Sequence, residues 1–218
     1  MEYLVTMTTT VPDGTTDEVV QEIRGREAAR SRELATQGHL LRLWRPPLQP
    51  GEWRTIGLFT AADEMELDDV LASMPLRIWR NDQVVGLAIH PNDPPRSAIS
   101  SAAEFLTGFT VTIPDDAEVT EVDRIKAGEA DRTRELAEQG HLVRLWMLPP
   151  TPGHWHALGL WRAEDGEQLA AMLRSLPMDR WMTTETTHLT EHPNDPGRPG
   201  MDQGPARARS GRSAADAR

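Results

Sequence analysis

The chain has 218 residues, a formal net charge of −11 and no cysteine. An acidic field repels a phosphate backbone, so nucleic acid is not an expected partner, and the lack of thiols excludes disulfides, thiolate metal sites and cysteine nucleophiles. The sequence contains neither an apolar run of about eighteen residues that could span a membrane nor a signal-peptide pattern at its start, so we expect no membrane partner and a cytoplasmic location.

The first predicted elements are a strand, a helix and a hairpin. Residues 3–11 are rich in β-branched residues and end at a Pro-Asp-Gly turn, which is typical of a strand. Residues 16–37 carry apolar side chains at helical spacing, and Gly38 follows where a helix end favours a left-handed residue. Residues 40–44 and 53–59 are predicted strands on either side of a loop, so they form the hairpin.

A second helix and a last strand complete this unit. Residues 63–73 form the predicted helix, with Asp63 as the candidate N-cap and Pro75 just beyond its end. Residues 76–89 supply the last predicted strand. The order β-α-β-β-α-β is the ferredoxin-like motif, in which two helices cover one face of an antiparallel sheet and leave the other face open.

The second half of the chain repeats the first. Residues 32–44 recur 102 positions later as residues 134–146, and the His-Pro-Asn-Asp-Pro segment 90–94 recurs as 192–196. A period of this length describes two domains rather than a solenoid, which needs three or more repeats. The predicted fold class is therefore α+β, with tandem ferredoxin-like (βαββαβ) domains that bury their open sheet faces against each other as a pseudo-dimer.

The repeat divides the chain into four segments. Residues 1–95 are the first repeat, residues 96–103 a linker rich in Ser and Ala, and residues 104–196 the second repeat. Residues 197–218 hold five arginines and two aspartates, a net charge of 5 − 2 = +3, with few apolar side chains. Such a segment cannot bury enough apolar surface to fold, so we expect a disordered basic tail.

One acidic residue lies on the apolar stripe of the first predicted helix. Glu27 follows Ile23 on that stripe, and Glu129 has the same place in the second repeat. Burial penalises a carboxylate and raises its pKa, which suits proton transfer near neutral pH. Glu27 and Glu129 are therefore candidate catalytic residues. A structural ion pair of Glu27 with Arg30 or Arg42 is an equally good interpretation of the pattern.

Arginines on the next strand are candidate ligands for a substrate carboxylate. Arg42 and Arg45 flank Trp44, and an arginine beside a pocket glutamate can clamp a carboxylate with two hydrogen bonds. The second repeat keeps Arg144 but has Met147 where the first has Arg45. For at least one of these arginines, exposure on the solvent side of an edge strand is the simpler interpretation.

The chain uses tryptophan far more than other aromatic residues, with seven tryptophans against three phenylalanines and one tyrosine. Tryptophans on three predicted strands of each repeat could form an aromatic wall for a flat ligand, or could pack the sheet. These substrate-binding candidates are Trp44, Trp53 and Trp79, with Trp146, Trp155 and Trp181 in the second repeat. The histidines form no tight ligand cluster and no glycine-rich phosphate loop is present, so no metal or nucleotide cofactor is expected.

Taken together, these residues make each repeat similar to muconolactone isomerase from end to end. The resemblance is carried by the glutamate eleven residues before Gly38, the Leu-Trp-Arg triplet 43–45, the Pro75-Leu76 pair and the closing His90-Pro91. It implies a ferredoxin-like subunit that pairs through its sheet, larger homo-oligomers with the active site between subunits, and catalysis without a cofactor. The glutamate at positions 27 and 129 would be the acid–base group.

The resemblance also implies an activity. Family members move a proton along an unsaturated lactone and convert muconolactone into the enol-lactone of 3-oxoadipate during aromatic catabolism. Arg42 and Arg144 stand where the family commonly has histidine, and the hairpin and the segment after Pro75-Leu76 also differ. We therefore expect retained proton transfer with a changed specificity surface, on a small unsaturated lactone or cyclic carbonyl compound. The alternatives are a non-catalytic small-molecule binding or assembly protein and a specialised-metabolism cyclase.

Overall fold

The computed structural model describes residues 1–95 and 102–197 of the chain. Most of the predicted linker 96–103, and the predicted basic tail apart from Gly197, lie outside the described residues. Within the described ranges, no helix is both long enough and apolar enough to cross a membrane.

Both halves have the predicted order of elements, with one short 3-10 helix added to each. The first half consists of β1 (Glu2–Thr9), α1 (Asp17–Gln37), β2 (Leu40–Arg45), β3 (Arg54–Thr60), α2 (Glu64–Ala72), η1 (Pro75–Trp79) and β4 (Arg80–Ile89). The second half consists of β5 (Ala103–Val111), α3 (Val119–Glu138), β6 (Leu142–Met147), β7 (Trp155–Ala163), α4 (Gly166–Arg174), η2 (Pro177–Trp181) and β8 (Met182–Glu191). The α+β fold and its two repeated units are thus confirmed.

Local signals explain most helix ends, and one of them corrects the sequence prediction. The Asp63 carboxylate accepts a hydrogen bond from the Glu66 backbone N–H at 2.9 Å, as expected of an N-cap, and Gly38 ends α1 with a φ of 82°. Residues 76–79 were expected in a strand, but they belong to η1. Pro75 lacks an N–H and has a fixed φ, which suits the first position of a helical turn rather than a central strand.

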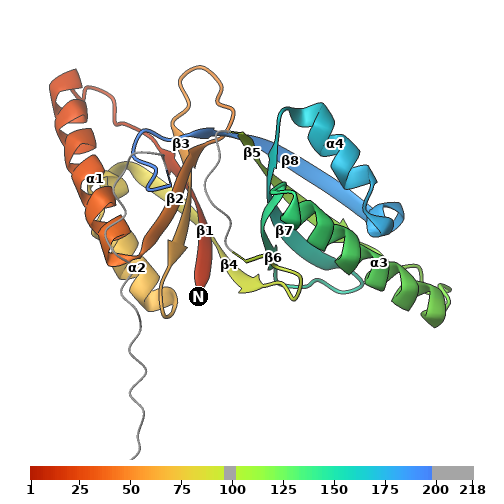
Figure 1. Ribbon diagram of the computed structural model, residues 1–218. Helices are drawn as coiled ribbons and strands as arrows, with labels where there is room; N and C mark the ends of the chain where they lie inside the picture. The colour runs from red at the N-terminus through yellow and green to blue at the C-terminus, as the bar shows by residue number, and fades with distance from the viewer. Residues whose placement is uncertain (96–101, 198–218) are drawn as a thin grey trace, which may run out of the picture.

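The strands of both halves close one barrel in the order β1-β3-β2-β8-β5-β7-β6-β4. Two short antiparallel pairings join the halves: β2 pairs with β8 at Trp44 and Glu191, and β4 pairs with β6 at Ile89 and Trp146. Figure 1 shows the barrel in the middle, with α1 and α2 on one side and α3 and α4 on the other. The open sheet face of each half is therefore covered by the other half, as the pseudo-dimer prediction requires.

The apolar core has separate layers inside and outside this barrel. Side chains from both halves fill the interior: Leu4, Trp44, Ile56, Leu58, Leu87, Leu106, Val143, Trp146, Leu158, Leu160 and Leu189. Outside, α1 and α2 cover one cluster that includes Leu34 and Leu71, and α3 and α4 cover another that includes Leu136 and Leu173. Since strand side chains alternate between faces, a strand can contribute to both layers, as β1 does with Leu4 inside and Val5 outside.

Candidate functional site

Glu27 is buried between α1 and the turn that follows α2. Only 8% of its surface is exposed. Its Oε2 accepts a hydrogen bond from the Leu76 backbone N–H at 2.8 Å, and its Oε1 accepts one from the Arg80 guanidinium at 3.2 Å. The 3-10 helix η1 therefore holds the carboxylate through a main-chain donor, and the start of β4 holds it through a cation.

The sequence prediction missed Arg80 as the partner of Glu27. Arg80 also forms a two-point ion pair with Asp82, at 2.6 and 3.0 Å. The side chains of Arg80 and Asp82 are 2% and 3% exposed, so this pair is shielded from solvent. The two partners suggested by the sequence lie elsewhere: Arg30 pairs with Glu33 and Arg42 with residues of the second half. The predicted ion pair of Glu27 with Arg30 or Arg42 is therefore wrong.

The surroundings of Glu27 favour its protonated form more than water does. Burial raises the pKa of the carboxyl above its ordinary value of 4.5, and the nearby Asp82 adds to this effect. The Leu76 N–H and Arg80 lower the pKa without cancelling the effect of burial. A carboxyl tuned in this direction can take up and return a proton nearer to neutral pH than an exposed glutamate can.

Glu27 lines a cavity of about 300 Å³ on the outer side of the barrel, a volume suited to a small molecule. The walls come from β1, α1, β2, the β2–β3 loop, β3, the α2–β4 turn and a segment of the second half. The lining residues are Met7, Thr9, Gln21, Arg24, Gly25, Glu27, Ala28, Ser31, Leu43, Arg45, Trp53, Thr55, Met74, Leu76, Arg80, His192, Pro193 and Asn194. Of the residues predicted from the sequence, the cavity thus brings together Glu27, Arg45 and Trp53.

Two arginines give the cavity a positive wall. Arg45 and Arg24 both line it, and within the described residues neither forms an ion pair with a carboxylate. Arg24 lies over the indole of Trp53, with 5.3 Å between the guanidinium carbon and the ring centroid. In a protein with a net charge of −11, such cations mark a place where an anion is stabilised.

The second half completes this wall with its His192–Asp195 turn. The fully buried Asp195 carboxylate accepts hydrogen bonds from the Leu43 backbone N–H at 2.8 Å and from Arg42 at 3.0–3.2 Å. This docking fixes the turn against β2, and His192 lies in the cavity wall. The sequence prediction did not assign His192 to the site, because its neighbours come from the other repeat.

Arg42 and Trp44 belong to a network that joins the halves. Arg42 pairs with Glu104 at 2.6 Å, and the Trp44 indole N–H donates to the same carboxylate at 2.7 Å. Burial opposes ionisation of Glu104, but these hydrogen bonds and the charges of Arg42 and Arg162 lower its pKa below the ordinary value. The network is a structural contact in the interior of the molecule rather than part of the cavity lining.

The same network recurs on the opposite side of the barrel. Arg144 pairs with Glu2 at 2.8 Å and with Asp93 at 3.2 Å, and the Trp146 indole donates to Glu2 at 2.6 Å. Asp93 also accepts a hydrogen bond from the Leu145 backbone N–H at 2.6 Å. Each half therefore anchors its C-terminal turn on the other half.

Glu129 occupies the equivalent helix position in the second half but has different neighbours. Its Oε2 accepts a hydrogen bond from the Met178 backbone N–H at 2.9 Å, and burial raises its pKa. Within residues 1–95 and 102–197, it forms no ion pair. Met182 and Met147 stand 102 positions after Arg80 and Arg45. The second half thus keeps the carboxylate and its main-chain donor without these two cations.

The remaining tryptophans have varied surroundings. Trp155 is 53% exposed and lies under Lys126, whose ammonium is 4.5 Å from the ring centroid. Trp181 is buried in an apolar cluster with Ile125 and Met178. Trp79 ends η1, and its carbonyl accepts a hydrogen bond from the Thr10 N–H. Trp44 and Trp146 lie in the barrel interior. In neither repeat does the structure therefore bring the three predicted tryptophans together into an aromatic wall.

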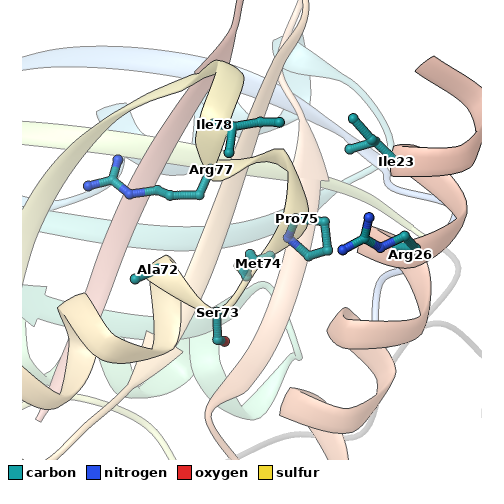
Figure 2. Close-up of a pocket in the computed structure, with 8 residues that line it drawn as sticks. All are labelled: Ile23, Arg26, Ala72, Ser73, Met74, Pro75, Arg77 and Ile78. Atoms are coloured by element: carbon teal, nitrogen blue, oxygen red, sulfur yellow. The ribbon is translucent and has the colours of Figure 1, made fainter. Parts of the chain in front are cut away.

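A separate groove of about 360 Å³ lies between α1 and η1. Figure 2 shows Ile23 and Arg26 of α1 across from Pro75, Arg77 and Ile78, with Ala72, Ser73 and Met74 completing the lining. Arg77 pairs with Asp82 at 3.3 Å, and Arg26 pairs loosely with Glu22 at 3.9 Å. Since both arginines already face carboxylates, this groove is a weaker anion site than the cavity of Glu27.

Comparison with known proteins gives a consistent match to one family. A family model described as Muconolactone delta-isomerase matches residues 1–93 and, a second time, residues 103–195. Muconolactone Delta-isomerase 1 of Acinetobacter lwoffii is 32% identical over 92 residues, which are 42% of this chain and 93% of that protein. Muconolactone Delta-isomerase of Pseudomonas aeruginosa is 29% identical over 90 residues, which are 41% of this chain and 91% of that protein.

A solved structure extends the likeness to both halves together. A heme-binding protein from Thermus thermophilus aligns with 88% of this chain and 92% of its own, with a TM-score of 0.52. The sequences are 12% identical, so this likeness concerns the fold alone. It shows that another chain of similar length folds as two joined units of this kind.

Proposed function

The chain belongs to the muconolactone delta-isomerase family, and from that premise we propose that it is a cofactor-independent isomerase of small unsaturated lactones. In this proposal Glu27 is the acid–base residue, and the substrate carries a carboxylate that binds to Arg45. The single observation behind the proposal is a buried carboxyl with a raised pKa in a small-molecule cavity that also contains Arg45, which has no carboxylate partner in the described part of the chain.

The proposed reaction moves one proton and one double bond. Glu27 takes a proton from the ring carbon that bears the ring oxygen, and the electron pair of that C–H bond moves through the conjugated system onto the carbonyl oxygen. The resulting dienolate then accepts the proton at the carbon next to the carbonyl, and the double bond ends beside the ring oxygen. Atoms and electrons balance without an oxidant or a second substrate, as expected of carboxylate acid–base catalysis.

The contacts of Glu27 are compatible with this role. One hydrogen bond reaches each carboxylate oxygen, from Leu76 and from Arg80, and a carboxylate oxygen can accept a second. The two donors restrict the orientation of the group without using its full capacity. Arg80 is itself held by Asp82, so it acts on Glu27 as a fixed charge and positions it.

The substrate carboxylate is assigned to Arg45 by elimination among the cations of the wall. Arg80 already contacts Glu27 and Asp82, and Arg24 covers the face of Trp53. The guanidinium of Arg45 forms no ion pair within the described ranges and lies on the same face of β2 as Leu43, which also lines the cavity. A two-point contact there would orient the lactone ring toward Glu27.

We propose one active site in each chain, in the first half. The second half replaces Arg45 and Arg80 by methionines, and Met182 packs with the apolar clusters around α3 and α4. The first-half residues Met7 and Phe59 correspond to the larger Phe109 and Trp161. The second half thus has apolar side chains at the positions of two charged residues of the first-half cavity.

The test is proton NMR of muconolactone incubated with the full chain in heavy water. We expect the vinyl signals of muconolactone to be replaced by those of the enol-lactone, with solvent deuterium on the carbon next to the carbonyl. A panel of butenolides with and without an acetate arm would define the substrate class, and those without it should react more slowly. Tight binding of a butenolide without any isomerisation or exchange would instead support the alternative of a non-catalytic binding protein.

A further inference from the structure

His192 lines the cavity of Glu27, and its ring can donate a hydrogen bond. It belongs to the second half, and the docking of Asp195 on Leu43 and Arg42 fixes the turn that carries it. Glu27 belongs to the first half, so the cavity needs both repeats to be complete. The turn is further closed by a hydrogen bond from the Asp195 N–H to the His192 carbonyl at 2.9 Å.

The contacts of the His192 ring define which nitrogen carries the proton. Its Nδ1 lies 3.2 Å from the Asn194 backbone nitrogen, which donates a hydrogen bond to it. A ring nitrogen that accepts a hydrogen bond is unprotonated, so a neutral His192 carries its proton on Nε2. Burial and the charges of Arg45 and Arg24 lower the pKa of His192 to about 4. The ring is therefore neutral at neutral pH, and its Nε2–H has no hydrogen-bond partner among the described residues.

We infer that the Nε2–H of His192 donates the hydrogen bond that holds the carbonyl oxygen of the lactone while negative charge develops on it. This inference rests on the proposed function. During the reaction the His192 proton stays on nitrogen: Glu27 alone exchanges a proton with carbon, and His192 stabilises the dienolate. A fixed neutral donor in a site shielded from water can lower such a barrier substantially.

The arrangement also gives the second half a role in the reaction. Its own carboxylate lacks the cations of the first half, yet its C-terminal turn supplies the donor to the first-half cavity. The equivalent His90 has the same ring contact, an N–H donated by Asn92 to Nδ1 at 3.1 Å. His90 therefore provides a matched control with the same turn geometry on the opposite side of the barrel.

The experiment compares two substitutions that keep different parts of the imidazole. In His192→Gln the side-chain amide can reach the position of Nε2 and donate there, whereas in His192→Asn the shorter amide replaces Nδ1 and leaves no donor at the position of Nε2. With muconolactone, we expect kcat to fall about 100-fold or more for His192→Asn and less than about tenfold for His192→Gln. His90→Asn and His90→Gln should keep the kcat of the parent chain.

The order of the two variants separates catalysis from structure. If His192 only held the turn, Asn would preserve the contact with Asn194 and Gln would not, so His192→Gln would be the slower variant. That result, or equal kcat values for both variants and the parent chain, would overturn the inference. Urea unfolding of the His192 and His90 variants would measure any loss of turn stability directly.

A second experiment tests the role of His192 by ligand binding, without catalytic turnover. Tetronate, the ionised enol of a five-membered lactone, imitates the dienolate oxygen, and we expect it to shift the Nε2–H proton signal of His192 downfield. It should bind at least about tenfold more weakly to His192→Asn than to His192→Gln. Tetronate that binds without moving this signal would exclude the role of His192. In one further outcome, the parent chain isomerises no butenolide and still shows the tetronate-induced shift and the difference in tetronate affinity between the variants. That result would refute the proposed reaction but support His192 as a hydrogen-bond donor to an oxyanion.

Discussion

The two halves share a backbone and differ at the site, and this difference separates what the fold provides from what individual side chains add. In both halves a glutamate of the long helix accepts a hydrogen bond from the turn after the short helix, from Leu76 to Glu27 and from Met178 to Glu129. Burial raises both pKa values. The βαββαβ unit alone therefore produces a carboxyl with a raised pKa, whether or not cations stand beside it.

The cations are what distinguish the halves. The first half adds Arg80 beside its glutamate and Arg45 in the cavity wall, and the second half has methionines at both positions. The contacts between the halves, in contrast, are symmetric: Arg42 and Arg144 each hold the C-terminal turn of the other half. The duplication has therefore kept its structural symmetry while its two sites have diverged.

The largest expected difference between the halves is in the effect of removing the carboxylate. Glu27→Gln should lower kcat for muconolactone by about 1,000-fold, since general acid–base groups contribute about 10²–10⁴-fold. Glu129→Gln should leave kcat within about twofold of the parent chain. Steady-state kinetics of both variants test this. A comparable loss in Glu129→Gln would show two working sites and contradict the assignment to the first half.

The next largest effect concerns stability. Arg80→Met introduces the residue of the second half but leaves the Asp82 carboxylate, 3% exposed, with Arg77 as its remaining partner. Breaking a buried ion pair in this way should cost about 3 kcal/mol, measured by urea unfolding. Because the second half has Thr184 where the first has Asp82, Arg80→Met/Asp82→Thr should recover most of the loss. A double variant as unstable as the single one would contradict this explanation.

A smaller effect should follow from exchanging Arg45 and the equivalent residue of the second half, Met147. Arg45→Met should raise KM for muconolactone about 10- to 100-fold, because a charge-assisted contact with the substrate carboxylate is lost. The KM of a butenolide without the acetate arm should hardly change, which controls for altered cavity shape. Met147→Arg should leave both KM values unchanged. An equal rise in KM for both substrates after Arg45→Met would contradict the proposal that Arg45 binds the substrate carboxylate.

The smallest effect should be the dependence of stability on the charge of Glu129. Burial raises the pKa of Glu129, so the folded state favours the protonated carboxyl. The contribution of Glu129 to the free energy of unfolding is therefore fully present below the unfolded-state pKa and is lost as pH rises through the folded-state pKa. Glu129→Gln should therefore have the stability of the parent chain near pH 4 and exceed it at pH 7. Urea unfolding at the two pH values measures the difference, and a larger gain at pH 4 would show that the pKa is lowered instead.

Much of the architecture could be predicted from local patterns. The offset repeat gave two domains, and the alternation of apolar residues gave the strands and helices to within a few residues, because backbone conformation follows periods of two and 3.6. Residues 76–79, at the start of the last predicted strand, were the exception, because Pro75 begins a 3-10 helix that includes them. The place of Glu27 on a buried helix face was predicted by the same periodicity.

The partners of that glutamate were decided by tertiary structure. Arg80 lies 53 residues from Glu27 in the chain, and His192 comes from the other repeat. Strand pairing and barrel closure bring such distant residues together, and they produce no periodic pattern in the sequence that could predict the contact. The two arginines of β2 show the same limit. Arg42 and Arg45 are three residues apart and so point to opposite faces of the strand. Only the packed barrel determines that Arg45 faces the cavity and Arg42 the contact between halves.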